Sequence, residues 1–135
     1  MYAKKHILII ESQKDLQKIL KLSLKIEAGW EAVTVDCERE AAMLLDRIEF
    51  DAIILNLVNG DRLPTLAKLK TNPQSAPIPI IAIGLSDRAG ESSYLTKLGA
   101  AVVIPQMLNP ILLSDRIAKK LNWFMNNPQF YNHSR

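Results

Sequence analysis

The sequence predicts an α/β fold in which strands and helices alternate as (βα)5 around one doubly wound, five-stranded parallel sheet. Two observations predict it. Five short apolar runs alternate with segments of helical periodicity along the 135 residues. The runs are apolar at nearly every position, as in strands that helices cover on both faces. A chain of this length forms one domain, which we expect over residues 1–127, followed by a polar tail over residues 128–135.

The predicted strands are short runs rich in isoleucine, valine and leucine that end at polar residues or turn residues. They are "HILII" (6–10), "EAVTVD" (31–36), "DAIILNL" (51–57), "PIPIIAIGL" (77–85) and "AAVVIP" (100–105). In an open parallel sheet, binding sites lie outside the carboxyl ends of the strands, near the point where the strand order reverses. The residues that end these runs are therefore the first candidates for a site.

The helical segments repeat apolar residues at intervals of three and four. In the first helix, Ser12 is the expected N-cap, the apolar face includes Leu16, Ile19 and Leu20, and Gly29 is the expected stop. The other helices are predicted over residues 38–50, 61–72, 86–99 and 109–127. The last one begins with Asn-Pro, a pair typical of a cap and first turn.

Composition narrows the classes of function. Hydrophobic residues make up 48% and charged residues 23% of the chain, as in ordinary globular domains. No apolar run approaches the length of a membrane span, and the N-terminus lacks the cleavage region of a signal peptide. The single cysteine, Cys37, excludes an internal disulfide, so we expect a cytoplasmic location. The net charge of +3 comes from dispersed lysines, which does not favour a nucleic-acid site.

Asn56 is the polar residue within the third apolar run. A carboxylate at this strand end could act as a nucleophile or a metal ligand, whereas a neutral amide is a poor substitute for either role. The expected role is structural: hydrogen bonds to Gln106, Ser12 or loop amides would satisfy a buried polar group. Binding of a small molecule or of a partner's polar group is the alternative.

The span from about residue 4 to 126 resembles the receiver domain of two-component response regulators. The matching stretches are "KKHILIIESQKDLQKILKLSL", "FDAIILNLVNGD", "IPIIAIGLSD" and "KLGAAVVIPQMLNPILLSDRI". The resemblance implies a flavodoxin-like, CheY-like three-layer sandwich and a place in phosphorelay signalling. Receivers of this family bind Mg²⁺ through an acidic pair after the first strand and an Asp after the third. That Asp accepts a phosphoryl group from a histidine kinase.

The family's chemical positions fall on residues that lack the family's chemistry. The acidic pair falls on Glu11 and Ser12, the acceptor on Asn56, the hydroxyl residue on Gly84 and the lysine on Gln106. The resemblance therefore implies a degenerate receiver without aspartyl phosphorylation, enzymatic activity, bound metal or cofactor. Such a domain would act through protein–protein interaction or dimerisation. Glu11 remains a candidate metal ligand, although a plain strand-end acid is the simpler interpretation.

Two other functions remain open. Asp61 could serve as an atypical phospho-acceptor if the shortened loop after the third strand brings it into the site. Asp51 and Ser12 are weaker candidates, because Asp51 begins the third strand and lies at the opposite end of the sheet. Alternatively, a small ligand could occupy the vacated pocket, which Gly84 would enlarge because it lacks a side chain.

The first helix carries a basic stripe of lysines spaced by four, three and four residues. Its members are Lys14, Lys18, Lys21 and Lys25. In the family that the chain resembles, this helix is part of the surface that meets the kinase, so the stripe is a candidate docking face for an acidic partner. A solvated helix face is the simpler interpretation.

Tyr94 and Trp123 are candidate interface aromatics on the predicted fourth and fifth helices. Trp123 is expected to point sideways or outward, because Leu121 and Phe124 occupy the apolar stripe of its helix. In the family, the face formed by the fourth helix, the fifth strand and the fifth helix is the usual dimer and output surface. The expected partners are a sensor kinase, an output domain or protein, or a second copy of this chain. Nucleic acid would be reached only through an output domain outside this sequence.

Overall fold

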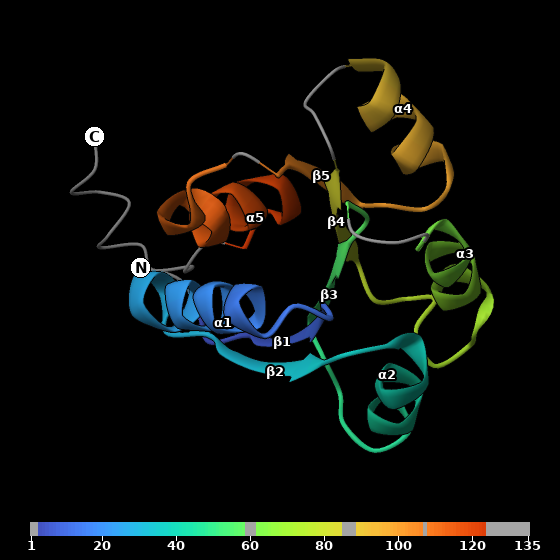
Figure 1. Cartoon of the computed structure of the whole chain (residues 1–135), viewed down its shortest axis with the longest axis horizontal. Helices are drawn as coiled ribbons and strands as arrows, with labels where there is room; N and C mark the ends of the chain where they lie inside the picture. The colour runs from blue at the N-terminus through green and yellow to red at the C-terminus, as the bar shows by residue number, and fades with distance from the viewer. Residues whose placement is uncertain (1–2, 59–61, 85–88, 107, 124–135) are drawn as a thin grey trace.

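The computed structural model describes residues 3–58, 62–84, 89–106 and 108–123 and shows one sheet with helices on both faces (Figure 1). All neighbouring strands are parallel, in the order β2-β1-β3-β4-β5. The strands are β1 (His6–Ile10), β2 (Glu31–Val35), β3 (Ala52–Asn56), β4 (Ile80–Gly84) and β5 (Val102–Pro105). The predicted (βα)5 order and doubly wound fold are confirmed.

The helices form two layers (Figure 1). On one face lie α1 (Lys14–Ala28), the 3₁₀ helix η1 (Pro110–Leu112) and α5 (Leu113–Leu121). On the other face lie α2 (Glu38–Leu45), α3 (Leu63–Thr71) and α4 (Ala89–Lys97). None of these described helices has the length and apolar character that crossing a membrane requires.

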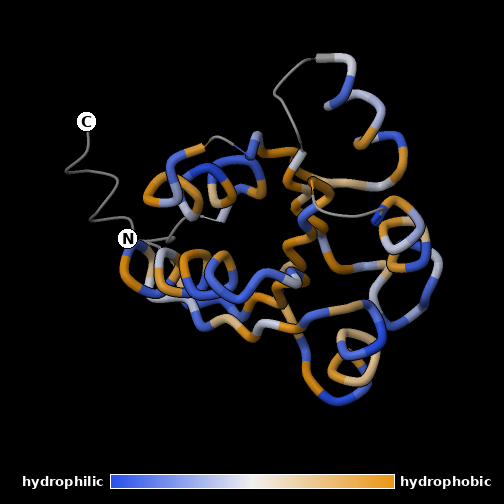
Figure 2. Tube along the Cα trace, in the orientation of Figure 1, coloured by the Kyte–Doolittle hydropathy of each residue, from blue (hydrophilic) through white to orange (hydrophobic). Residues whose placement is uncertain are grey.

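Strand side chains alternate between two hydrophobic clusters, one on each face of the sheet. In β1, Ile7 and Ile9 face α1 and α5, whereas Leu8 and Ile10 face the layer of α2, α3 and α4. All four are fully buried, and each burial stabilises the fold by about 1.5–3 kcal/mol. Figure 2 shows the resulting band of hydrophobic residues along the strands. Burial on both faces explains why the strands lack an alternating polar pattern.

The first helix begins one residue later than a Ser12 cap would place it. Gln13 occupies the N-cap position and makes no side-chain cap, so the prediction for Ser12 is wrong. The Glu11 carboxylate instead accepts the backbone N–H of Gln13 at 2.8 Å. The predicted stop is confirmed: Gly29 has a left-handed φ of 73°, and its N–H bonds to the carbonyl of Lys25.

The last helical segment is shorter than the predicted span of residues 109–127. The Asn-Pro start is confirmed, because the Asn109 side chain caps η1 by accepting the N–H of Ile111. The helix α5 ends at Leu121, where Asn122 turns to a left-handed φ of 60°. Trp123 therefore follows the helix, and Phe124 lies outside the described residues.

Trp123 packs inward, which contradicts the expectation that it points outward from the fifth helix. Its ring meets the buried Trp30 edge-on, with ring centroids 5.4 Å apart and planes at 78°. The Lys5 ammonium lies 4.6 Å from the ring centroid of Trp123, within cation–π range. The left-handed turn at Asn122 redirects the chain toward the first hydrophobic cluster, the one between the sheet and the layer of α1 and α5. Trp123 is half-buried against this cluster.

Candidate functional site

The structure brings the predicted site positions to the carboxyl edge of the sheet. Glu11 follows β1, Asn56 ends β3, Gly84 ends β4 and Gln106 follows β5. Ser12 is adjacent to Glu11 and is exposed. In a parallel sheet all carboxyl ends meet at one edge, and Glu11 and Asn56 flank the point where the strand order reverses between β1 and β3.

A buried hydrogen bond between Asn56 and Glu11 forms the centre of the site. Both side chains are 1% exposed. Asn56 Nδ2 donates to Glu11 Oε1 at 2.5 Å, and Asn56 Oδ1 accepts the backbone N–H of Val58 at 2.9 Å. The expected bond to a loop amide is thus confirmed, whereas the expected bonds to Gln106 and Ser12 are absent among the described residues. Since Gln13 donates to the other Glu11 oxygen, both carboxylate oxygens are satisfied.

Gln17 supports this centre from α1 and was not identified from the sequence. Its side chain is 7% exposed, and its Nε2 donates to the backbone carbonyl of Glu11 and, at 2.8 Å, to Asp36 Oδ1. It therefore ties the end of β1 to the end of β2. The helical row of Leu20 and Leu24, extended back by one turn, reaches position 17, so a buried polar residue could have been inferred there.

Lys14 forms an ion pair with Asp36 beside the site. Its ammonium lies 2.7 Å from Asp36 Oδ1. The hydrogen bonds from Lys14 and Gln17 hold the pKa of the Asp36 carboxyl below its usual value. The lysine at the start of the basic stripe is therefore engaged in an exposed ion pair beside the site.

The Glu91 side chain lies next to Gly84. A Cβ placed on Gly84 would lie 2.1 Å from Oε1 of Glu91, which belongs to α4. The half-buried Glu91 carboxyl takes part of the volume that a side chain at position 84 would occupy, and a cavity of about 170 Å³ remains beside both residues. No sequence pattern pointed to Glu91, since its approach to β4 depends on how α4 packs.

The chemistry available at this edge is hydrogen bonding by neutral amides and by carboxylates. Within the described ranges no group of three or more His, Cys, Asp or Glu side chains could hold a metal ion. Asp51 lies at the amino end of β3, where its carboxylate accepts the backbone N–H of His6 at 2.7 Å. Asp61, the alternative acceptor, lies outside the described residues.

Helix α1 presents two different faces to solvent. Its four predicted lysines are exposed, and two of them form ion pairs, Lys14 with Asp36 and Lys25 with Glu31. Beside the lysines, Ile19, Leu22 and Ile26 are 46%, 59% and 67% exposed. The assignment of Ile19 to the buried face is therefore wrong.

The 3₁₀ helix η1, which contacts α1, also carries two exposed apolar residues, Ile111 and Leu112. These five residues are called the α1–η1 surface here: Ile19, Leu22, Ile26, Ile111 and Leu112. Tyr94 on α4 is 54% exposed, as expected for an interface residue, whereas Trp123 is half-buried and packs against Trp30. The lysine spacing was readable from the sequence, whereas the exposure of the apolar residues on the same helix was not.

Comparison with known proteins gives matches at the level of structure only. No family model and no curated protein sequence matches the chain. CheY4, a chemotaxis response regulator of Vibrio cholerae, superposes with a TM-score of 0.76 at 18% identity, over 87% of this chain and 99% of its own. The receiver domain of a signal transduction histidine kinase from Syntrophus aciditrophicus gives 0.72 at 23% identity, over 91% and 94%.

A third match is the receiver domain of the sensor histidine kinase PA1611 from Pseudomonas aeruginosa, with a TM-score of 0.72 at 17% identity, over 89% of this chain and 99% of its own. That structure has a magnesium ion coordinated in its active-site cleft. The likeness extends over nearly the whole length of each of these domains. The chain therefore has the flavodoxin-like fold of CheY-like response-regulator receiver domains.

Proposed function

We propose that the protein is a receiver-like domain of two-component signalling that acts through protein–protein interaction, without aspartyl phosphorylation. The buried bond between Asn56 and Glu11 is the observation that carries this proposal. A phosphoryl acceptor must be a nucleophile, and the amide of Asn56 instead serves as a donor to the one acid beside it. The site is thus built to satisfy its own polar groups.

The surroundings of Asn56 also disfavour a phosphoryl group. Transfer of phosphoryl needs cations or hydrogen-bond donors around the transferred oxygens. Here the Glu91 carboxyl lies against Gly84, and the neutral Gln106 stands at the family's lysine position. An incoming phosphate would meet the negative charge of Glu11 without the lysine that would offset it.

The α1–η1 surface supports the protein-binding part of the proposal. Exposed apolar residues gathered on one face mark interaction sites, whereas single ones are ordinary. The lysines along the same helix favour a partner helix that carries acidic residues beside its own apolar face. Antiparallel pairing of two α1 helices is disfavoured, because it would place the lysine row of one copy beside that of the other. A sensor kinase or an output protein is the partner class that we propose.

The phosphorylation part is tested by amide NMR titration with Mg²⁺ and then beryllofluoride, a phosphoryl mimic that bonds to an acceptor carboxylate. We expect no saturable shift at residues 11, 56, 84 and 106, while a receiver domain with an acceptor aspartate responds under the same conditions. Saturable shifts at these residues would contradict the proposal. Loss of those shifts in Asp61→Asn would then identify Asp61 as an atypical acceptor.

A further inference from the structure

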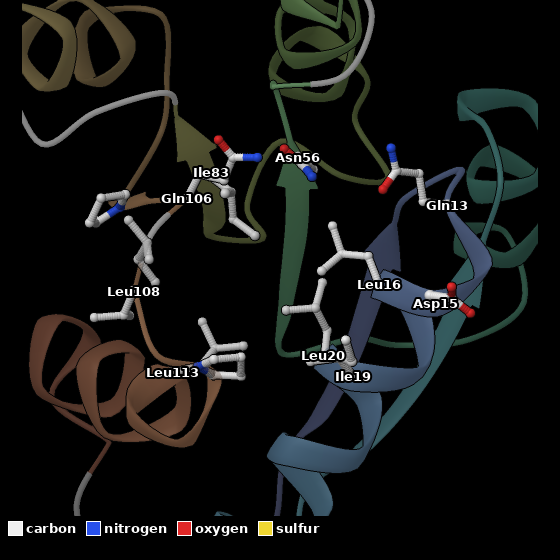
Figure 3. A pocket seen from close by; sticks show the side chains of 13 residues that line it. Gln13, Asp15, Leu16, Ile19, Leu20, Asn56, Ile83, Gln106, Leu108 and Leu113 are labelled. Carbon is white, nitrogen blue, oxygen red and sulfur yellow. The ribbon is translucent and has the colours of Figure 1, made fainter.

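A cavity of about 440 Å³ lies next to the Asn56–Glu11 bond, between the start of α1 and the segment that joins β5 to α5 (Figure 3). It differs from the small space at Gly84, which lies toward α4. Its volume is in the range of pockets that bind small molecules. It also lies at the carboxyl edge of the sheet, where ligands of open α/β sheets bind.

The body of the cavity is apolar. Leu16 and Leu20 enter it from α1, and Leu108 and Leu113 enter it from the opposite side, as Figure 3 shows. The strand residue Ile104 also lines it. A ligand that fills this part of the cavity must therefore be largely apolar, because a polar group there would lose its bonds to water.

One end of the cavity is lined by neutral amides. Asn56 and Gln106 lie at this end, and Gln13 lies across from them (Figure 3). The side chains of Gln13 and Gln106 make no hydrogen bond to any residue that the structure describes. Asn56 keeps one N–H beyond the one that it donates to Glu11. These amides together offer both donors and acceptors.

The charges around the cavity select against an anion. Among its described lining residues there is no lysine, arginine or histidine, and its one charged side chain is the exposed Asp15. The buried Glu11 carboxylate lies directly behind Asn56. A carboxylate or phosphate at the amide end would find no cation and would be repelled by Glu11.

We propose that this cavity binds a neutral small molecule with an apolar body and a head group that both donates and accepts hydrogen bonds. The apolar body lies among the leucines of α1 and α5, and the head group meets the amides of Asn56 and Gln106. The cavity shares one residue, Ile19, with the α1–η1 surface, and it adds a ligand-binding role to the proposed protein-interaction role. Neither role depends on the other.

Three probes with the same phenylpropyl body and different head groups test this proposal by amide NMR titration. They are neutral 3-phenylpropanamide, anionic 3-phenylpropanoate and cationic 3-phenylpropylamine. We expect saturable shifts for the amide at residues 16, 20, 56, 104, 108 and 113, and roughly tenfold weaker binding of the acid. Absence of saturable shifts with the amide, shifts elsewhere on the molecule, or equal or tighter binding of either charged probe would overturn the proposal.

Matched variants locate the bound probe. Leu16→Phe adds bulk inside the cavity and should abolish binding of 3-phenylpropanamide. Leu44→Phe makes the same change at a half-buried leucine on the opposite face of the sheet and should leave binding unchanged. The opposite pattern would overturn the proposal.

The exposed Gln106 gives a second test that does not depend on how the cavity variant folds. Gln106→Leu should weaken binding of the amide and leave the weak binding of propylbenzene, which lacks a head group, unchanged or stronger. If the variant binds the amide as tightly as wild type does, the proposed head-group contact is wrong.

Discussion

At the scale of single residues, Asn56 sets the hydrogen bonding at the carboxyl edge of the sheet. As an amide it donates to Glu11 and accepts from the Val58 backbone at the same time, which a carboxylate could not do. Hydrogen bonds to a charged group are worth about 1.5–3 kcal/mol each. Asn56 therefore stabilises the buried Glu11 carboxylate.

Asn56→Asp should destabilise the domain by about 2–4 kcal/mol at pH 7, because it places two buried carboxylates in contact. Protonation of one carboxyl removes the repulsion between the two acids, so the penalty should be smaller at acidic pH than at pH 7. Urea unfolding at a series of pH values measures both the size and the direction of the effect.

The swapped double variant is the control for this prediction. Glu11→Gln combined with Asn56→Asp restores one amide and one carboxylate, so it should recover most of the lost stability. A double variant that is no more stable than Asn56→Asp alone would show that the loss does not come from charge repulsion.

The lowered pKa values of Asp36 and Glu31 account for part of the stability that the domain loses at low pH. Hydrogen bonds from Lys14 and Gln17 lower the pKa of Asp36, and a hydrogen bond from Lys25 lowers that of Glu31. A lowered pKa contributes stability above the unfolded-state value, and that contribution is lost as pH falls through the folded value. Asp36→Asn and Glu31→Gln should each make urea midpoints less sensitive to pH below about pH 5.

Salt gives an independent check of this acid response. Both acids are exposed, so their ion pairs are screened at high ionic strength. The wild-type slope below about pH 5 should approach that of the two variants in roughly 1 M NaCl. A slope that neither substitution nor salt changes would mean that other carboxyls govern acid unfolding.

At the scale of single elements, α1 has three faces with different roles. Gln17, Leu20 and Leu24 are buried against the sheet, the lysines lie along the β2 side, and the apolar residues of the α1–η1 surface face solvent. A helix with only a structural role would carry polar residues on its outer face. The exposed face of α1 is therefore the strongest indication of a protein partner in this molecule.

Two substitutions separate binding from stability on this surface. Leu22 on α1 and Met43 on α2 are both 59% exposed. We expect Leu22→Glu and Met43→Glu each to change the free energy of unfolding by less than about 0.5 kcal/mol. Only Leu22→Glu should abolish binding of a synthetic amphipathic helix that carries glutamates beside its apolar face.

A peptide of opposite charge tests whether the lysines of α1 contribute to binding. An analogue with lysines in place of the glutamates should bind more weakly, and isothermal titration calorimetry at low and high salt measures the difference. Equal binding of both peptides, or loss of binding in Met43→Glu, would argue against a docking site on the α1–η1 surface.

At the scale of the whole molecule, the two ends of the described chain meet at one corner. The Trp30 indole donates to the backbone carbonyl of Ala3 at 3.0 Å, and its ring packs edge-on with Trp123. Lys5 contacts the ring of Trp123 from the N-terminal side. The segment after α5 therefore helps to close the first hydrophobic cluster.

Trp123→Ala should lower the free energy of unfolding by about 2–3 kcal/mol, because it removes a half-buried aromatic ring and its contact with Trp30. Trp123→Phe keeps an aromatic ring there and should lose less. Tyr94→Ala removes an exposed ring and should change stability by under about 0.5 kcal/mol. Chemical unfolding followed by far-UV circular dichroism compares the three, and equal losses would contradict the assigned packing.

The order of elements and the two-sided burial of the sheet follow from the sequence alone. Runs such as "HILII" and "AIIL" are apolar at consecutive positions, as is typical of strands that are buried on both faces. Segments with helical periodicity separate these runs. Local sequence also determined the left-handed stop at Gly29 and the cap at Asn109. These features depend on residues that are close together in the chain, so they can be predicted without knowledge of the tertiary structure.

The contacts within the site were decided by tertiary structure. The amide of Asn56 had several possible partners, and the choice of Glu11 depends on how β1 and β3 lie in register. Likewise, Glu91 lies next to Gly84 only because α4 packs there, and Trp123 turns inward only because Trp30 offers a surface. Periodicity and residue type determine which side chains are buried, whereas partners distant in sequence are chosen by the geometry that the packed elements share.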